Sequence, residues 1–171
     1  MGGFAKVYRA QLQGPAGFRK TAALKLIKEI SPKAAAEIVY EGRVGGLLKH
    51  RNVVDTYELA MWDNVGFVAM EWVDGLSLKA LIRKGALAPS VVLEIGLGIC
   101  RGLNYVHRLR GPQGALGLAH LDLKPANVLI GWDGSVKVAD FGIARLTKLA
   151  AEQTGSIQGT PAYLSPEQAR G

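Results

Sequence analysis

The sequence has few of the features that mark secreted, membrane-spanning or disulfide-stabilised proteins. Cys100 is the only cysteine, which excludes an internal disulfide and fits a reducing compartment. Because it lies in an apolar helical stretch, we expect its thiol to be buried. No apolar run approaches the roughly 20 residues that a membrane-spanning helix needs, and the N-terminus has no signal-peptide core. We therefore expect a cytoplasmic location for this part of the protein, which leaves open a membrane anchor elsewhere in its parent.

Acidic residues are also scarce, with 14 Asp and Glu against 21 Lys and Arg and a net charge of +7. A polyanion such as nucleic acid is one explanation for such an excess. However, the basic residues are spread along the chain and form no block of five or six. We therefore interpret them as a solvated basic surface and expect no nucleic-acid partner.

The pattern of apolar residues predicts two different halves. The first half reads as an antiparallel sheet with one helix that runs from Ser31 to about Lys49. Its predicted strands cover residues 4–10, 21–27, 53–61 and 65–71. The second half is mainly helical, because apolar residues recur at spacings of three and four after Pro89. The fold class is thus α+β in two lobes, with residues 72–75 as the hinge.

A predicted hairpin in the second half carries the first chemical signal. Asp133-Gly134 separates two short apolar runs, residues 128–130 and 136–138, and is a strong turn signal. In such a hairpin the flanking residues Asn127 and Asp140 lie side by side. An amide oxygen and a carboxylate at one end of a rigid hairpin suit Mg²⁺. Asp122 and Lys124 precede them closely and add a proton acceptor and a phosphate contact, which phosphoryl transfer requires.

Three motifs in order resemble the protein kinase family. Residues 120–127, HLDLKPAN, resemble its catalytic loop, with Leu121 where the family usually has Arg. Residues 140–142 match D-F-G, and residues 159–167, GTPAYLSPE, resemble the end of the activation segment. Lys124 resembles the Ser/Thr class, and the continuation QARG at residues 168–171 is similar to bacterial Ser/Thr kinases of the eukaryotic (Hanks) type.

The resemblance implies roles for particular residues in an ATP site. Asp122 and Lys124 would be catalytic, and Lys25, in a V-A-I-K-like run, would contact the α- and β-phosphates and pair with Glu41. Asn127 and Asp140 would hold Mg²⁺ or Mn²⁺. The remaining nucleotide contacts would come from the Gly-rich loop, the hinge and the purine sandwich, namely Gly2, Gly3, Val7, Ala23, Met70, Glu71, Val73 and Leu129. His120 would pack on Phe141, and Thr160 would hydrogen-bond near Asp122 and Lys124.

The resemblance also implies how the domain is divided and what is missing. Residues 1–71 would form the N-lobe without its first strand, residues 72–75 the hinge and residues 76–171 an incomplete C-lobe. The kinase domain would thus be truncated at both ends. Gly45 stands where the family places a bulky apolar residue, so we expect a void of about a Leu side chain there.

Three functions are compatible with these residues. The resemblance implies a protein Ser/Thr kinase that uses ATP, phosphorylates Ser or Thr of protein substrates and can self-associate and autophosphorylate. A second reading is an ATP-binding pseudokinase or inactive kinase fragment, to which Leu121 and Gly45 point. A basic interaction module without enzymatic activity ranks far below. The presence of Lys25, Glu41, Asp122, Asn127 and Asp140 together favours the kinase.

Overall fold

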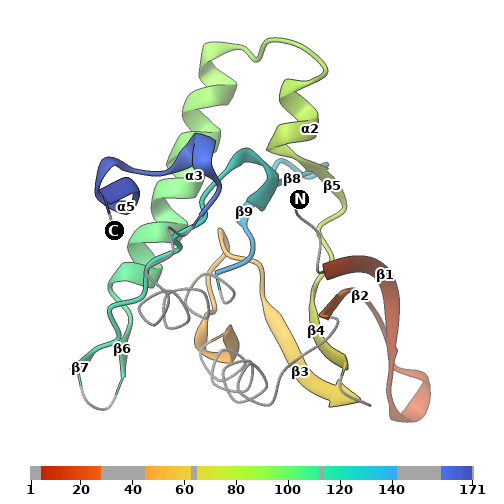
Figure 1. The fold of residues 1–171 in the computed structure, drawn as a ribbon. Coiled ribbons are helices and arrows are strands. Elements are labelled where there is room, and N and C mark those ends of the chain that lie inside the picture. Colours follow the sequence, from red (N-terminus) through yellow and green to blue (C-terminus); the bar gives the residue numbers. More distant parts are fainter. Residues whose placement is uncertain (1–4, 28–44, 63–64, 112–113, 142–158, 171) are drawn as a thin grey trace. The chain divides into compact units, whose positions relative to one another are not determined.

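The computed structural model describes residues 5–27, 45–62, 65–111, 114–141 and 159–170 (Figure 1). The chain divides into two compact units. The first consists of Met1–Lys49 and Asp55–Trp72, and the second of His50–Val54 and Val73–Gly171. The crossing from Trp72 to Val73 lies within the stretch expected to be the hinge. The architecture is α+β, as the sequence predicts.

The first unit contains a four-stranded antiparallel sheet with the strand order β1-β2-β4-β3. Its strands are β1 (Ala5–Gln13), β2 (Arg19–Ile27), β3 (Thr56–Trp62) and β4 (Val65–Glu71). The turn between β1 and β2 is a short 3₁₀ helix, η1 (Pro15–Gly17). Gly17, with φ of 79°, adopts the left-handed conformation that glycine tolerates best. The expected strands are therefore present and differ mainly at their ends.

The predicted strand at residues 53–61 is wrong at its beginning. Val53 and Val54 are buried in the second unit, where Val53 forms a parallel bridge to Val138. The Val54 N–H donates to the Val138 carbonyl at 2.9 Å. His50 belongs to the same segment and stacks on Tyr105 with ring centroids 4.9 Å apart. Two consecutive valines favour an extended conformation, but the local sequence does not determine which strand they pair with.

Gly45 is buried, but the expected void is occupied. A Cβ atom placed on Gly45 would lie 3.1 Å from the Thr56 hydroxyl and 3.4 Å from the Thr56 Cβ. The Thr56 side chain from β3 therefore takes the space directly beside this glycine. Of the predicted helix, the structure describes helical residues 45–47, and residues 28–44 lie outside the described part.

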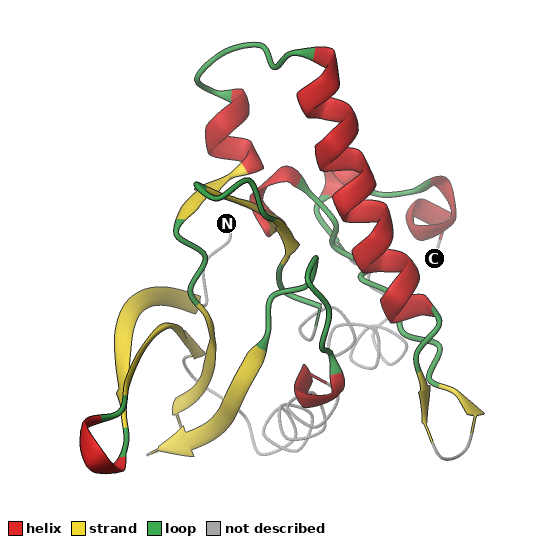
Figure 2. Cartoon of the chain, turned by 180° about the vertical axis from the view of Figure 1, so that it is seen from behind, coloured by secondary structure: helices red, strands yellow, loops and turns green. Residues whose placement is uncertain are grey.

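The second unit is organised around the long helix α3 (Pro89–His107), which Figure 2 shows from behind. A small sheet of order β5-β8-β9 packs with it, formed by β5 (Gly75–Ser77), β8 (Val128–Gly131) and β9 (Val136–Val138). Ile95, Val128 and Val136 form the buried centre of this unit. The neighbouring helix α2 (Leu78–Ile82) begins at Ser77, whose hydroxyl accepts from the Ala80 N–H at 3.2 Å.

The buried face of α3 consists of Ile95, Gly98, Gly102 and Val106, which recur at spacings of three and four. Cys100 lies about 200° around the helix from Gly98, and its side chain is exposed, so the expectation of a buried thiol is wrong. The helical period was predicted correctly. The buried face was not, because apolar residues also occur on the exposed sides of α3.

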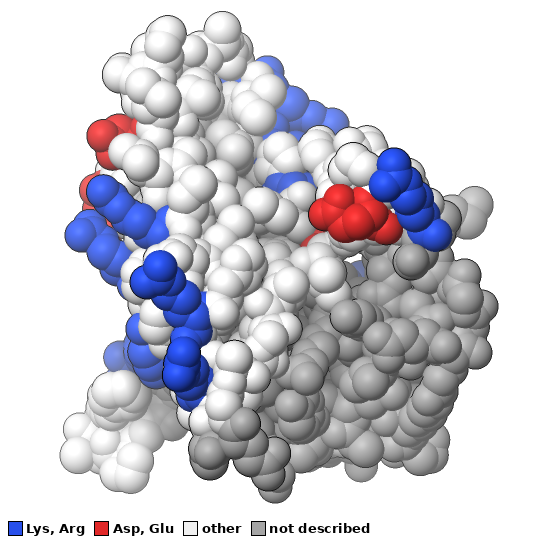
Figure 3. Space-filling model, turned by 90° about the vertical axis from the view of Figure 1, so that its left-hand side faces the viewer, with Lys and Arg blue, Asp and Glu red and all other residues white. Residues whose placement is uncertain are grey.

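The remaining elements of the second unit are short. After α3, β6 (Arg110–Gly111) pairs with β7 (Gly114–Ala115). The others are η2 (Pro125–Asn127), η3 (Pro161–Tyr163) and α5 (Pro166–Arg170). Among the described helices, none is both long and apolar enough to cross a lipid bilayer. Lys and Arg occur at several places on the described surface in Figure 3, with Asp and Glu among them.

Candidate active site

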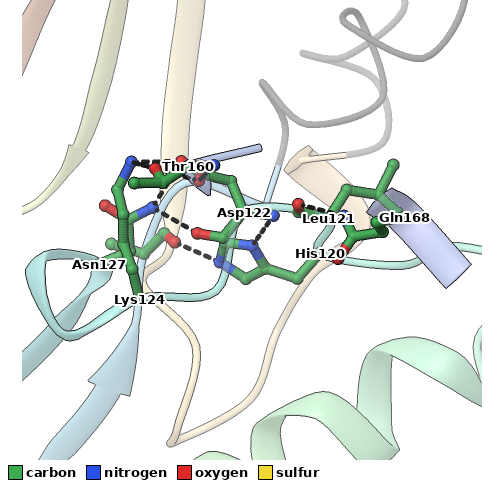
Figure 4. A network of polar contacts seen from close by, with 8 residues as sticks. His120, Leu121, Asp122, Lys124, Asn127, Thr160 and Gln168 are labelled. Atoms are coloured by element: carbon green, nitrogen blue, oxygen red, sulfur yellow. Dashed lines mark hydrogen bonds and ion pairs between the residues drawn. The ribbon is translucent and has the colours of Figure 1, made fainter. Parts of the chain in front are cut away.

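Leu123 anchors the loop from His120 to Asn127, because its side chain packs against the core of the second unit. Leu123 alternates with its neighbours Asp122 and Lys124, whose polar groups join one network (Figure 4). The loop ends in η2, where Pro125 supplies the first-turn geometry, and β8 follows directly. An apolar residue between two charged ones thus anchors both charges without burying them.

Both oxygens of the Asp122 carboxylate accept hydrogen bonds. Lys124 Nζ donates to Oδ2 at 2.5 Å, while Thr160 donates to Oδ1 from its hydroxyl at 2.8 Å and from its backbone N–H at 3.1 Å. The Thr160 hydroxyl in turn accepts from Lys124 Nζ at 2.8 Å. The contact expected of Thr160 is confirmed, and it closes a ring of three side chains.

This network keeps Asp122 ionised. Desolvation by burial works to raise the pKa of Asp122, but the hydrogen bonds from Lys124 and Thr160 and the Lys124 charge outweigh it. The pKa of Asp122 is therefore lowered from its usual value. An ionised carboxylate here can accept a proton, as a general base must.

His120 supports the loop as a neutral ring. Its Nε2 lies 2.9 Å from the Ala139 carbonyl, and the Asp122 N–H donates to its Nδ1 at 3.3 Å. A carbonyl can only accept and an N–H can only donate, so the proton sits on Nε2. Burial lowers the pKa of His120, which favours this neutral form. Its ring lies 4.7 Å from that of Phe141, centroid to centroid, as predicted.

Asn127 and Asp140 stand at the open end of the β8–β9 hairpin. Val128 pairs with Val138, and the Ala139 N–H donates to the Asn127 carbonyl at 2.9 Å, which places Asp140 one residue beyond the last bond. The Asn127 amide nitrogen donates to the Asp122 carbonyl at 3.0 Å. That bond uses the amide nitrogen, so the amide oxygen is the atom that could serve as a metal ligand.

The chemistry of these two side chains fits a hard cation. A carboxylate and an amide oxygen are ligands that Mg²⁺ accepts, with water and phosphate oxygens completing its octahedron. Within the described ranges, no group of three or more His, Cys, Asp or Glu side chains could hold a metal. Because two side chains supply only part of an octahedron, Asn127 and Asp140 suit a metal that arrives with a nucleotide.

The first unit carries most of the other predicted nucleotide contacts that the structure describes. Lys25 lies on β2 with 8% of its surface exposed, and its strand neighbours are Val7 on β1 and Val68 on β4. Ala23 is buried and pairs with Met70. A lysine so enclosed among strands has its chain direction fixed, which suits a defined phosphate contact.

Glu71 is restricted in what it can offer a base. Its backbone N–H donates to the Asp55 carbonyl at 2.8 Å, so only its carbonyl could face an adenine. Val73 and Leu129 belong to the second unit, and Leu129 on β8 pairs with Ser77 and Lys137. Gly2, Gly3 and Glu41 lie outside the described residues.

One further side chain, which the sequence did not predict, belongs to the network. Gln168 donates from its side-chain amide to the Leu121 carbonyl at 2.8 Å (Figure 4). The spacing Ser165-x-x-Gln168 could have indicated a helix start there, but not the partner 47 residues earlier in the chain.

Known proteins share the motifs of this site. The sequence model of the family described as protein kinase domain matches residues 1–171. The chain belongs to the protein kinase domain family.

Several similar proteins are bacterial kinases. A probable serine/threonine-protein kinase of Streptomyces coelicolor is 38% identical over 99% of this chain and 25% of its own length. The tyrosine-protein kinase MasK of Myxococcus xanthus is 32% identical over 99% of this chain and 28% of its own length. The crystal structure of the PknI kinase domain of Mycobacterium tuberculosis matches with a TM-score of 0.67 and 26% identity, over 82% of this chain and 54% of that one. The chain thus spans about a quarter of the curated relatives' length.

Proposed function

We propose that the protein is an ATP-dependent protein serine/threonine kinase. The observation that carries this proposal is the Asp122 carboxylate, held by Lys124 and Thr160 beside the hairpin that presents Asn127 and Asp140. A base, a cation and two hard-oxygen ligands are the parts that phosphoryl transfer needs, because its catalysis is mostly positioning and charge stabilisation.

Each residue has a separate task in this proposal. Asp122 orients the substrate hydroxyl and accepts its proton on the Oδ2 lone pair that Lys124 does not use, where Asn127 Nδ2 donates at only 3.5 Å. Lys124 offsets negative charge near the transferred phosphoryl group, and Lys25 contacts the α- and β-phosphates. Asn127 and Asp140 would hold Mg²⁺ or Mn²⁺, which neutralises phosphate charge when bound.

The choice of serine and threonine over tyrosine rests on Lys124. It stands two residues after Asp122, as in the Ser/Thr class, and bonds to both Asp122 and Thr160. One relative is named a tyrosine-protein kinase, so the acceptor must be measured rather than assumed. Phosphoamino-acid analysis of a labelled protein substrate should give phosphoserine and phosphothreonine; phosphotyrosine alone would contradict this assignment.

The catalytic assignment is tested with Asp122→Asn in the full protein. This change keeps the shape and removes the proton acceptor, so phosphotransfer should fall at least about 100-fold. The affinity for Mg·ATP should stay within about twofold, since Asp122 is not assigned to the nucleotide. Lys25→Met is the matched comparison, because it should remove activity through loss of the phosphate contact.

The outcomes separate the kinase from the pseudokinase. Wild-type turnover in Asp122→Asn would overturn the role of Asp122. A wild-type protein that binds Mg·ATP without transferring phosphate would instead identify an ATP-binding pseudokinase, the alternative to which Leu121 points. Autophosphorylation and self-association belong to the same proposal. Autophosphorylation is measured in the same labelled samples, and self-association by the molar mass in solution.

A further inference from the structure

Helix α5 begins with a capping box that uses both ends of the Gln168 side chain. The Ser165 hydroxyl accepts from the Gln168 N–H at 3.4 Å, and Gln168 Oε1 accepts from the Ser165 N–H at 3.2 Å. This is the reciprocal S-x-x-E/Q arrangement at a helix N-terminus. In this capping box the Gln168 amide oxygen accepts a hydrogen bond, and the amide nitrogen can donate to another partner.

That nitrogen donates to the Leu121 carbonyl at 2.8 Å. Glutamate would serve the capping box equally well but would present an oxygen to that carbonyl. Only glutamine can cap the helix and donate to Leu121 at the same time. The capping box therefore explains a Glu or Gln at position 168, and the contact to Leu121 explains why it is Gln.

The receiving peptide is the one that orients the catalytic carboxylate. The Leu121 carbonyl and the Asp122 N–H belong to a single planar unit. Its oxygen accepts from Gln168, and its N–H donates to the His120 carbonyl at 2.9 Å and to His120 Nδ1 at 3.3 Å. A planar group held from both edges has little freedom to rotate. Because Asp122 Cα is part of that plane, the start of its side chain is fixed too.

The backbone around this contact requires such support. Leu121 has a φ of 62°, in the left-handed region that branched residues rarely adopt. Gly159, with a φ of 106°, also lies close, since a Cβ there would be 3.1 Å from the Leu121 carbonyl oxygen. Gly159 directly precedes Thr160, which also bonds to Asp122. The segments before Asp122 and before Thr160 therefore meet where Gln168 donates.

We propose that Gln168 is a positioning residue for phosphoryl transfer. It holds the Leu121–Asp122 peptide and so keeps the Asp122 carboxylate in register with Thr160. This inference rests on the proposed kinase function, and it assigns Gln168 no contact with substrate, metal or nucleotide.

The test compares three variants of the full protein with the wild type. Gln168→Glu keeps the cap and removes the donor, Gln168→Met removes donor and cap without adding charge, and Ser165→Ala weakens the cap but keeps the donor. We expect Gln168→Glu and Gln168→Met to lower kcat about tenfold or more, with KM for ATP within about twofold of wild type. Ser165→Ala should keep kcat within about twofold while its melting temperature falls.

Hydrogen exchange gives a readout that does not depend on activity. The amide of Asp122 should exchange about tenfold faster in Gln168→Glu and Gln168→Met than in wild type or Ser165→Ala. An inactive wild type would refute the kinase function, and exchange would still decide the role of Gln168. Wild-type kcat and exchange in both Gln168 variants would overturn the inference. So would losses in Ser165→Ala equal to theirs, because Gln168 would then act only through the helix.

Discussion

At the scale of single residues, the hydroxyl of Thr160 is the group that joins Asp122 to Lys124. It donates to one and accepts from the other, both at 2.8 Å. Thr160→Val keeps the shape but removes both bonds, so we expect activity to fall about tenfold or more. Thr160→Ser retains the hydroxyl and should keep most of the activity. Peptide phosphorylation by the two variants measures the difference, and equal activities would show that the hydroxyl is dispensable.

The same substitution should also change the pH dependence of catalysis. A hydrogen bond from Thr160 is one of the contacts that lower the pKa of Asp122 against the effect of burial. Without it the pKa of Asp122 rises, and the carboxylate gains its proton at a higher pH. The acid limb of the kcat/KM profile of Thr160→Val should therefore lie at higher pH than that of wild type. Coincident acid limbs would contradict this link.

His120 should make the stability of the protein depend on pH. Burial lowers the pKa of folded His120 below the unfolded value of about 6.5. Well above that pH, His120 is neutral in both the folded and the unfolded protein, and its full contribution to stability is present. As the pH falls below about 6.5, the unfolded state binds a proton that the folded state does not, so stability decreases until the folded pKa is reached.

The predicted measurement is the melting temperature between pH 7.5 and 5.5. It should fall less steeply in His120→Gln, which has no group to titrate but can still donate to the Ala139 carbonyl. His50 also has a pKa lowered by burial, and next by Arg51 and Lys137, so His50→Gln is measured separately. An unchanged slope in His120→Gln would show that His120 does not contribute.

At the scale of elements, the packing of α3 depends on glycine. A Cβ on Gly102 would lie 2.7 Å from the Asn52 carbonyl oxygen, which is backbone and has little room to move. Gly102→Ala should therefore destabilise the protein by about 1–3 kcal/mol despite its better helix propensity. Gly96 is the matched control on the same helix, because nothing lies within 4 Å of its Cβ position. Gly96→Ala should be neutral or stabilising by up to about 1 kcal/mol.

Urea denaturation of the two variants tests this difference. A Gly102→Ala protein as stable as wild type would show that the segment from His50 to Val54 can move away from α3. Such a result would weaken the assignment of that segment to the second unit. A loss of stability in Gly96→Ala would instead indicate a general intolerance of α3 to side chains.

At the scale of the whole molecule, nucleotide and metal should stabilise the protein together. Asn127 and Asp140 offer oxygen ligands, and the metal they suit is one that also binds phosphates. At 100 times the dissociation constant a ligand adds about 2.7 kcal/mol. We therefore expect Mg·ATP to raise the melting temperature by about 5 °C or more. ATP with EDTA should raise it much less.

The matched variant is Asp140→Asn, which removes the charge of one proposed ligand while keeping its shape. It should lose most of the Mg-dependent part of the shift. An equal shift with and without Mg²⁺ in the wild type would contradict the metal assignment of Asn127 and Asp140. It would leave the proposed role of Asp122 to be decided by its own variant.

Local features of the sequence were enough to predict much of this protein. The turn Asp133-Gly134, the period of α3 and the spacing of Asp122, Lys124, Asn127 and Asp140 are short-range patterns, and the structure contains the expected hairpin and helix. Pairing of His120 with Phe141 and of Thr160 with Asp122 followed from the family resemblance. These features depend either on residues that are close in the chain or on motifs that the kinase family shares.

Tertiary structure alone decided the contacts between distant segments. Val53 pairs with Val138, Thr56 fills the space beside Gly45, and Gln168 donates to Leu121. A valine can extend any strand and a glutamine amide can serve any carbonyl, so residue type does not choose the partner. The exposed face that carries Cys100 was likewise set by which side of α3 meets β9 and Asn52. The physical reason is that burial and long-range hydrogen bonds are properties of the assembled unit, whereas propensity and spacing belong to the chain.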